Sequence, residues 1–273
     1  MSDYGLADEF VGVCHGVIRR VAPAATVVDI THGVLPNDIA VGAALLAEAV
    51  RHFPPAVHLA VVDPGVGTKR RGIVLQTGSG SCLVGPDNGL LIPASEALGG
   101  PAQCYELTNP TLRAERPSQT FHGRDIFAPA AGHIARGVEL SAFGPAVPVA
   151  ELVTPEPPFA GVVEGRPVRE AVGEVVLIDR FGNLTTSLAA SHLAAAGAVP
   201  GDVLDIVVGD QRLRAPYGDT FASVGSGEPV VLVDSHDLVA ICYNRGSAAE
   251  ALGAGRGTKV TLSLAGGSPA AGI

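Results

Sequence analysis

Apolar residues recur along the first half of the chain at two different spacings. Between residues 8 and 21 they return every three or four positions, which is typical of an amphipathic helix. A second stretch of this kind follows Asp38, a residue type that favours the N-cap of a helix. Residues 25–30 and 57–62 are short runs rich in β-branched side chains, which predict buried strands. The alternation indicates an α/β domain.

The second half of the chain has a different pattern. A proline-rich stretch around Pro155 and Pro158 predicts a linker over residues 153–169. Beyond it, short apolar runs are separated by Gly, Asp and Asn, which is typical of a β domain. We therefore expect an N-terminal α/β domain with a mostly parallel sheet over residues 1–152, a smaller β-barrel-like domain over 170–265, and a flexible tail over 266–273.

Composition narrows the class of protein. The chain has 273 residues, of which 47% are hydrophobic, so it can bury a full core and is not disordered. Its net charge of −9 argues against a nucleic-acid partner, which would require clustered Lys and Arg. The four cysteines have no metal-ligand spacing and are expected to be buried thiols. Without a signal peptide or a long apolar run, we expect a cytoplasmic protein with no membrane partner.

Five polar clusters interrupt the apolar background, and each has a purely structural interpretation. Asp63-Pro64-Gly65 is common turn chemistry, and the loop lacks the ending of a phosphate-binding loop. Asp125 could begin a helix, and residues 87–89 could form a tight turn. A single histidine such as His122 is more often a partly buried structural residue than a catalyst. The clusters are residues 2–8, 31–38, 63–71, 120–125 and 179–183.

The same residues could instead build a metal site, which would make the protein a metal-dependent hydrolase. Nitrogen and oxygen ligands are abundant in these clusters, but no two histidines have the HxxxH or HxH spacing that metal sites often show. This alternative therefore ranks second. The candidate ligands are His32, Asp38, Asp63, His122 and Asp125.

Taken together, the clusters resemble one enzyme family, the SAM hydroxide adenosyltransferases, which are related to the fluorinases and chlorinases. No single motif is specific, but their combination and order are, and the resemblance runs from the first residues to about Ser247. The motifs are Asp3-Tyr4-Gly5-Leu6-Ala7-Asp8, Val28-Asp29-Ile30-Thr31-His32, Val61-Val62-Asp63-Pro64-Gly65-Val66-Gly67-Thr68, Pro86-Asp87-Asn88-Gly89-Leu90-Leu91, Thr120-Phe121-His122-Gly123-Arg124-Asp125 and Asp179-Arg180-Phe181-Gly182-Asn183.

The resemblance implies hydrolysis of S-adenosyl-L-methionine (SAM) to adenosine and methionine, without a cofactor or metal. It implies a homotrimer whose active sites lie between subunits. It places the catalytic roles on Asp63, Arg70 and His122, with Arg71 as a neighbour that could be mistaken for Arg70. The substrate-binding positions that it implies are Asp3 for the ribose, Asp8, Asp179 and Ser235 for methionine, Phe181 and Asn183 for adenine, and Thr120, Phe121 and Gly123 beside the catalytic histidine.

Two departures from the relatives bear on these expectations. The relatives usually have a short apolar strand ahead of the first aspartate, whereas Asp3 is nearly the first residue here, so either the start lies upstream or this chain manages without that strand. His236 replaces an arginine that the fluorinase uses for the methionine carboxylate, which puts that contact in doubt.

The chemistry of the nucleophile separates hydrolysis from halogenation. Water must lose a proton when it attacks, so a charged network that accepts the proton helps, whereas a halide needs none. The resemblance aligns Asp63 with a tyrosine of the halogenases, which also lack the histidine, and Gly123 with a serine of the fluorinase. The residues leave open whether Asp63 or His122 accepts the proton. A halogenase of the same fold and a non-catalytic SAM- or adenosine-binding protein stay as alternatives.

Overall fold

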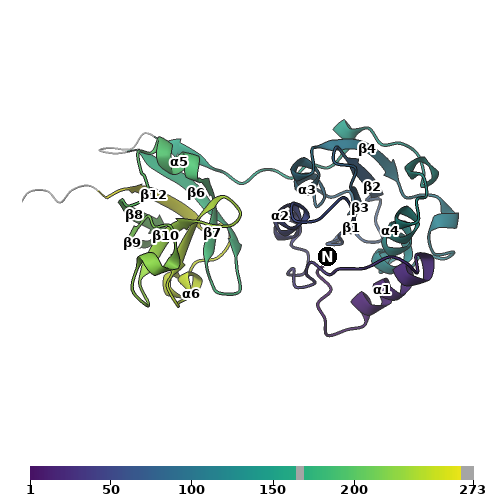
Figure 1. Cartoon of the computed structure of the whole chain (residues 1–273), viewed down its shortest axis with the longest axis horizontal. Helices are drawn as coiled ribbons and strands as arrows, with labels where there is room; N and C mark the ends of the chain where they lie inside the picture. Colours follow the sequence, from purple (N-terminus) through teal and green to yellow (C-terminus); the bar gives the residue numbers. More distant parts are fainter. Residues whose placement is uncertain (164–168, 266–273) are drawn as a thin grey trace, which may run out of the picture. The chain divides into compact units, whose positions relative to one another are not determined.

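The chain divides into two compact units, residues 1–156 and 157–273, in a computed structural model that describes residues 1–163 and 169–265 (Figure 1). The border falls in the proline-rich stretch. Positions 164–168 of the expected linker and the expected tail at 266–273 lie outside the described residues. Within the described residues, no helix is both long enough and apolar enough to cross a membrane.

The first unit is built from a four-stranded sheet and the helices around it. Its helices are α1 (Phe10–Val21), α2 (Ile39–Val50), α3 (Ile92–Ala97) and α4 (Ala128–Ala135), with short 3-10 turns at Pro110–Leu112, Leu140–Ala142 and Val149–Glu151. A π-helical turn, Gly123–Phe127, leads directly into α4. The strands are β1 (Val57–Leu59), β2 (Gly72–Thr77), β3 (Cys82–Pro86) and β4 (Pro101–Glu106).

The sheet has the order β1-β3-β2-β4, and its pairing is mixed. The α/β class is confirmed, but the sheet is not mostly parallel. Only the β1–β3 ladder is parallel, while β2 pairs antiparallel with both β3 and β4. The reason is that β2 and β3 are joined by a tight connection at Gly78–Ser81 rather than by a crossover helix, and such a connection reverses the strand direction.

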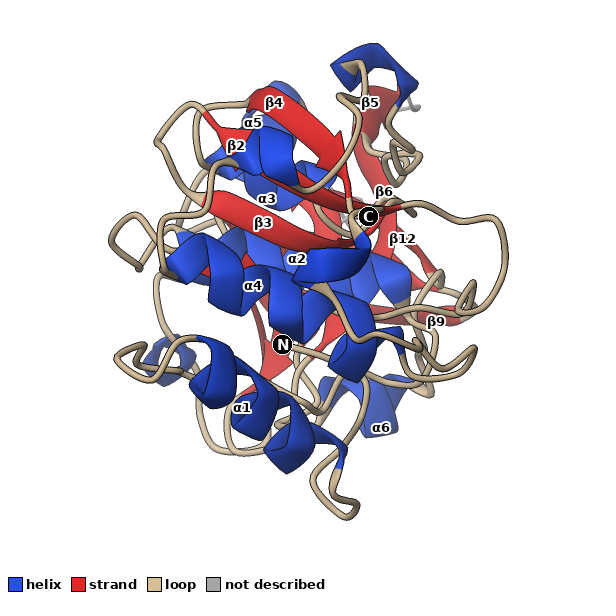
Figure 2. Ribbon diagram, turned by 90° about the vertical axis from the view of Figure 1, so that its right-hand side faces the viewer, coloured by secondary structure: helices blue, strands red, loops and turns tan. Residues whose placement is uncertain are grey.

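Alternate residues of the strands face two separate cores, as the pleat of a β-strand requires. Ile73 and Leu75 of β2 pack in a cluster with Leu46 of α2 and Ala94 of α3. Val74, between them, belongs to a second cluster that includes Phe127 and Ala130, next to and within α4. The unit is therefore a three-layer arrangement, with α2 and α3 on one face of the sheet and α4, backed by α1, on the other (Figure 2).

The prediction of a buried strand at residues 25–30 is wrong. The segment has no assigned strand, and Val28 is 62% exposed. Ser2 pairs parallel with Val61, and its N–H donates to the Thr31 carbonyl, but no described residue forms a ladder with residues 25–30. A β-branched run adopts strand structure only where a neighbour satisfies its backbone groups.

The second unit is an antiparallel sheet that nearly closes into a barrel, as predicted. Its strands are β5 (Gly161–Val163), β6 (Glu170–Ile178), β7 (Leu184–Ala189), β8 (Val203–Val208), β9 (Gln211–Pro216), β10 (Pro229–Val233), β11 (Leu238–Tyr243) and β12 (Lys259–Leu264). They run in the order β10-β11-β7-β6-β12-β8-β9, and a bridge between Tyr217 and Val231 brings the two edges together. Helices α5 (Ala190–Ala195) and α6 (Ala248–Leu252) and the 3-10 turn Phe221–Ser223 complete the unit.

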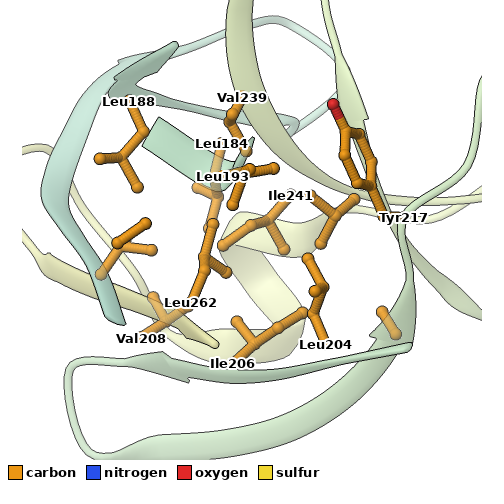
Figure 3. Close-up of a cluster of buried hydrophobic side chains, with 14 of the residues drawn as sticks. Leu184, Leu188, Leu193, Leu204, Ile206, Val208, Tyr217, Val239, Ile241 and Leu262 are labelled. Atoms are coloured by element: carbon orange, nitrogen blue, oxygen red, sulfur yellow. The ribbon is translucent and has the colours of Figure 1, made fainter. Parts of the chain in front are cut away.

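The interior of this barrel is filled by aliphatic side chains from almost every strand (Figure 3). Leu184, Leu204 and Ile241 are fully buried there, and Leu193 of α5 packs in the same cluster. Strand β5 is a correction to the expected linker, because it pairs with β6 through Val162 and its neighbours instead of crossing as coil. Val162, with Ala160 just ahead of the strand, packs against the barrel core.

His58 is an exception in the core of the first unit. It lies on β1 with 5% exposure, stacks edge-on against Phe53, and its Nε2 atom has no hydrogen-bond partner among the described residues. Burial lowers the pKa of His58 below its ordinary 6.5, and the nearby N-terminal amine lowers this pKa further. The unfolded chain therefore binds a proton more readily than the folded chain as pH falls through 6.5, so acidification destabilises the fold.

We predict that His58→Leu raises the free energy of unfolding at neutral pH by about 1 kcal/mol, because an unsatisfied buried polar group is removed. It should also make the loss of stability below pH 6.5 smaller than in the parent chain. Urea unfolding of both proteins across this pH range measures the two effects. Identical pH dependence would contradict the assignment of an acid-labile group to position 58.

Gly67 controls how closely two connections approach each other. Its φ of +76° is readily available to glycine only, and a β-carbon at this position would overlap the carbonyl oxygen of Gln119. The loop after residue 62 can therefore pack directly against the segment that precedes the π-helical turn. Gly80 has a similar φ of +85°, but a β-carbon there would meet nothing within 4 Å.

This pair of glycines gives a matched test. Gly80→Ala should lower the free energy of unfolding by about 1 kcal/mol, because alanine is strained in the left-handed backbone conformation. Gly67→Ala should cost distinctly more, because the two connections must also move apart. Thermal unfolding of the two variants measures the difference, and equal losses would show that the contact with Gln119 is relieved without cost.

Candidate functional site

A buried arginine joins an aspartate and a histidine in the first unit. Arg70 donates from Nε to Oδ1 of Asp63 at 3.0 Å, and from Nη2 to the second carboxylate oxygen. The same Nη2 lies 3.0 Å from Nδ1 of His122, fifty-two residues along the chain. The Arg70 and Asp63 side chains are only 8% and 6% exposed. Such a two-pronged, charge-assisted contact fixes the carboxylate in one orientation.

The contact with Arg70 also decides how His122 carries its proton. An arginine N–H can only donate, so Nδ1 of neutral His122 must accept, and its ring proton must then be on Nε2. Burial lowers the pKa of His122 below its ordinary 6.5, and the positive charge of Arg70 lowers it further. The imidazole is therefore neutral at pH 7. Its lone pair faces the guanidinium, and its N–H faces away from it.

Two neighbouring side chains, those of Asn88 and Phe127, support this network. Asn88 donates its side-chain N–H to the Val62 carbonyl at 2.9 Å, which holds the chain immediately ahead of Asp63. The guanidinium of Arg70 also lies over the Phe127 ring, 5.3 Å from its centre. Phe127 is fully buried and ends the π-helical turn that follows His122. Asn88 thus holds the backbone ahead of Asp63, and Phe127 packs against Arg70 in the turn that follows His122.

Arg71 is distinct from Arg70 in its contacts. It binds the buried carboxylate of Asp87 at 2.8 Å and the Glu151 carbonyl at 2.7 Å. Asp87 also accepts a hydrogen bond from the Val153 N–H. The residues expected to form a tight turn, 87–89, make the bend from β3 to α3, in which Asn88 Oδ1 accepts from the Leu90 N–H. The Asp87 and Asn88 side chains also organise the neighbouring connections.

The first residues of the chain lie beside the strand that ends at Asp63. The parallel bridge between Ser2 and Val61 places Asp3 and Asp63 beyond the same edge of the sheet, where ligands of α/β proteins collect. The Asn37 N–H donates to Asp3 Oδ2 at 2.9 Å. Asp8 lies in an exposed turn just ahead of α1.

An aromatic cluster lies around Gly123. The Tyr4 ring meets Phe10 and Phe121 edge-on, with ring centres 5.9 and 5.6 Å apart. A β-carbon at Gly123 would overlap the Tyr4 hydroxyl, so only glycine leaves room for this ring. Burial raises the pKa of Tyr4, so its hydroxyl stays protonated. Thr120 is exposed, and its hydroxyl lies 3.2 Å from that of Ser118.

Asp125 has a structural role that differs from the simple helix start considered from the sequence. It lies inside the π-helical turn, is 5% exposed, and accepts hydrogen bonds from the Ser118 N–H and from Arg124. The guanidinium of Arg124 in turn lies over the Phe121 ring, 5.1 Å from its centre. Asp125 therefore ties the 118–121 segment to the turn that carries His122. The N-cap role expected for Asp38 is confirmed by its bond to the Val41 N–H.

The candidate residues of the second unit gather at two turns. The Asp179 carboxylate accepts from the backbone N–H groups of Phe181 and Asn183, and from the Asn183 side chain at 2.7 Å. This closed turn displays the Phe181 ring, which is 70% exposed. Ser235 is exposed in the turn between β10 and β11, which Asp234 stabilises by accepting from the N–H groups of His236 and Leu238.

The metal site considered from the sequence does not assemble. In the described part of the chain, the one group with metal-ligand spacing is His15, Asp29 and His32, and it includes only His32 of the five candidates His32, Asp38, Asp63, His122 and Asp125. The cysteines behave as expected from their spacing. All four are buried and unpaired, and burial raises the pKa of the Cys14 thiol to about 11.

Three residues of the site were missed from the sequence. Tyr4 was read only as part of a motif, and nothing local indicated that its hydroxyl would lie over Gly123. Asn88 was assigned to a turn. Arg113 places a buried Nε with no hydrogen-bond partner in the described residues, and its charge contributes to lowering the pKa of His122. Tyr4 and Asn88 act through contacts between distant segments, and Arg113 acts through its charge.

Comparison with known proteins gives the same assignment for both units. Residues 1–144 match the SAM hydroxide adenosyltransferase N-terminal domain, and residues 173–261 match the C-terminal domain. An (R)-S-adenosyl-L-methionine hydrolase of Salinispora tropica is 46% identical, with 96% of this chain and 95% of that protein covered. A fluorinase of Actinopolyspora mzabensis is 30% identical over 91% of each chain.

A solved structure has the same fold. The crystal structure of an uncharacterized conserved protein from Thermotoga maritima superposes with a TM-score of 0.88 at 35% identity, covering 96% of this chain and 98% of that one. Sequence relatives, domain matches and fold therefore agree over nearly the whole length. The chain belongs to the SAM hydroxide adenosyltransferase family.

Proposed function

We propose that the protein hydrolyses S-adenosyl-L-methionine to adenosine and L-methionine by attack of water on the ribose C5′ carbon. The observation that carries this proposal is the buried network of Asp63, Arg70 and His122. The names of the relatives that are 40–47% identical support it. In the reaction the water oxygen bonds to C5′ while the C5′–S bond breaks. The bonding pair leaves with sulfur, which becomes neutral methionine, and one water proton is released.

We assign the acceptance of that proton to Asp63. His122 has its lone pair directed at Arg70 and would have to break that contact to act as a base. A carboxylate has several lone pairs, so Asp63 can accept from water while Arg70 still holds both of its oxygens. His122 then positions Arg70, and through it Asp63, and its Nε2–H can orient the water. In this proposal Asp63 would serve as the base for the attack, and no metal or cofactor would be needed.

The substrate contacts follow the positions of the family motifs. Asp3 would accept hydrogen bonds from the ribose hydroxyls, and Asp8 and Asp179 would face the methionine ammonium. Phe181, exposed on a rigid turn, would stack on adenine, and Asn183 would read its polar edge. Thr120, Phe121 and Gly123 would lie along the reacting centre, with Ser235 near methionine.

We further propose a homotrimer with each site at a subunit interface, located in the cytoplasm. In support, the candidate residues are divided between the two units, and each group is held rigidly in its own unit. Exposed apolar side chains such as Leu6 and Leu35 on the first unit suit a surface that another subunit covers. Neither nucleic acid nor membrane is expected as a partner.

The experiment that tests the reaction is incubation of the purified protein with SAM in oxygen-18 water, with and without chloride and EDTA. Adenosine labelled at the 5′ oxygen, with free methionine and no effect of EDTA, supports displacement at C5′ by water. A chlorinated nucleoside would instead indicate a halogenase. Unchanged SAM together with measurable SAM binding would indicate a non-catalytic binding protein.

Replacing the proton acceptor should separate turnover from binding. Asp63→Asn should lower kcat by about 100-fold or more, because an amide does not accept the water proton. The dissociation constant for SAM should change by only a few-fold. Asp205→Asn is the matched control, since it removes an exposed aspartate–arginine pair outside the site. Full turnover by the Asp63 variant would refute the assignment.

The pH dependence of kcat/KM should follow the protonation of His122. Because its pKa lies below 6.5, kcat/KM should be level from about pH 8 down to 6.5 and fall below that as the imidazole gains a proton. A protonated ring can no longer accept from Arg70 and places a second positive charge beside the guanidinium. His122→Gln should lose activity and also lose this acid limb. An acid limb that is unchanged in the variant would show that another group titrates.

A further inference from the structure

Three side chains that the proposed reaction does not use meet on the first unit. His15 belongs to α1, whereas Asp29 and His32 lie in the segment between α1 and α2. His15 Nε2 is 2.8 Å from Asp29 Oδ1, and His32 Nε2 is 3.1 Å from the same oxygen. One nitrogen or oxygen of each residue lies within 4.8 Å of those of the other two.

This donor set matches the chemistry of a divalent transition-metal ion. Two imidazole nitrogens and one carboxylate oxygen are ligands that zinc binds in proteins, and three protein ligands leave a position for water. In the metal-free state each ring donates an N–H to the shared carboxylate oxygen. A metal ion would take the place of these two ring protons. Asp29 Oδ1 would then no longer have to accept hydrogen bonds from both histidines.

The surroundings of His32 suit a ligand role. Its Nδ1 lies 2.7 Å from the Ser2 hydroxyl, which also accepts a hydrogen bond from the Tyr4 N–H. When Nε2 binds a metal, Nδ1 must have the ring proton and needs an acceptor. The Ser2 oxygen has two lone pairs, so it can accept from both groups. Metal-binding histidines commonly have an outer hydrogen bond of this kind, which fixes the ring.

The cluster is also accessible to an ion. The side chains of His15 and Asp29 are 34% and 45% exposed, while that of His32 is held at 10%. All three line a cavity of about 240 Å³, whose wall also includes His58 with its unsatisfied Nε2. A metal ion bound here would have one side open to solvent. His32, the least exposed of the three ligands, is the one that the Ser2 hydroxyl holds in place.

We propose that His15, Asp29 and His32 form a binding site for a zinc-class divalent metal ion, with water in the remaining position. The ion would clip α1 to the segment after it. Through Ser2 it would also secure the residues just ahead of Asp3. It is a structural site, separate from Asp63, Arg70 and His122, and it takes no part in the displacement reaction.

The test is titration of the chelator-stripped, tag-free full chain with Co²⁺, followed by visible absorption, and then competition with Zn²⁺. We expect one saturable site, which Zn²⁺ displaces. His15→Gln should weaken Co²⁺ binding at least tenfold. His52→Gln is the matched control, because it removes a histidine–carboxylate pair, His52 and Glu48, that lies outside the cluster. It should bind like the parent chain.

A thermal measurement separates a built site from weak surface binding. Equimolar Zn²⁺ should raise the Tm of the parent and of His52→Gln, and should leave that of His15→Gln unchanged. Asp29→Asn, which keeps the hydrogen-bonding oxygen but loses the charge, should bind Co²⁺ more weakly. Absence of saturable binding, or equal binding by the His15 variant, would overturn the proposal.

Discussion

The first unit depends on how one buried cation is satisfied. The Arg70 guanidinium is almost without exposure, and removing such a group from water costs several kcal/mol unless charged and polar partners replace the water. Asp63 supplies two oxygens and His122 supplies a lone pair. The Phe127 ring lies against the face of the guanidinium. Asp63 lies in the same connection as Arg70, whereas His122 and Phe127 belong to the π-helical turn and the residue ahead of it, so Arg70 ties these two segments together.

That constraint gives the two polar partners different chemical characters. His122 is partly buried and faces a permanent positive charge, so it is held neutral with a defined tautomer. Asp63 has the opposite charge to Arg70, and the guanidinium holds both of its oxygens. A buried ion pair is weak evidence for stability, because hydrophobic residues of similar volume often stabilise as well. The pair of Asp63 and Arg70 is better explained by the chemistry that an oriented carboxylate can perform.

A hydrogen-bonded carboxylate also organises the candidate residues of the second unit. Asp179 accepts from three donors of its own turn, and the turn thereby displays Phe181 without any packing from the barrel core. A large ring held at 70% exposure is costly to leave in water, and rigid presentation lowers the entropy lost when it binds a flat ligand. In both units a carboxylate near a strand end organises the candidate residues, through Arg70 in the first unit and through its own turn in the second.

The sequence by itself determined the local elements, because their signals lie within a few residues. The three-to-four-residue periodicity placed α1 and α2, Asp38 marked the start of α2, and the change of pattern after Pro158 separated the α/β unit from the barrel. Motif order named Asp63, Arg70 and His122 as candidates, and the tertiary structure brings these three together while Arg71 binds Asp87. Tertiary structure alone decided that residues 25–30 form no ladder and that His15, Asp29 and His32 converge. These outcomes depend on hydrogen-bond partners that lie far away in the chain, and a local pattern has no information about where such partners will be.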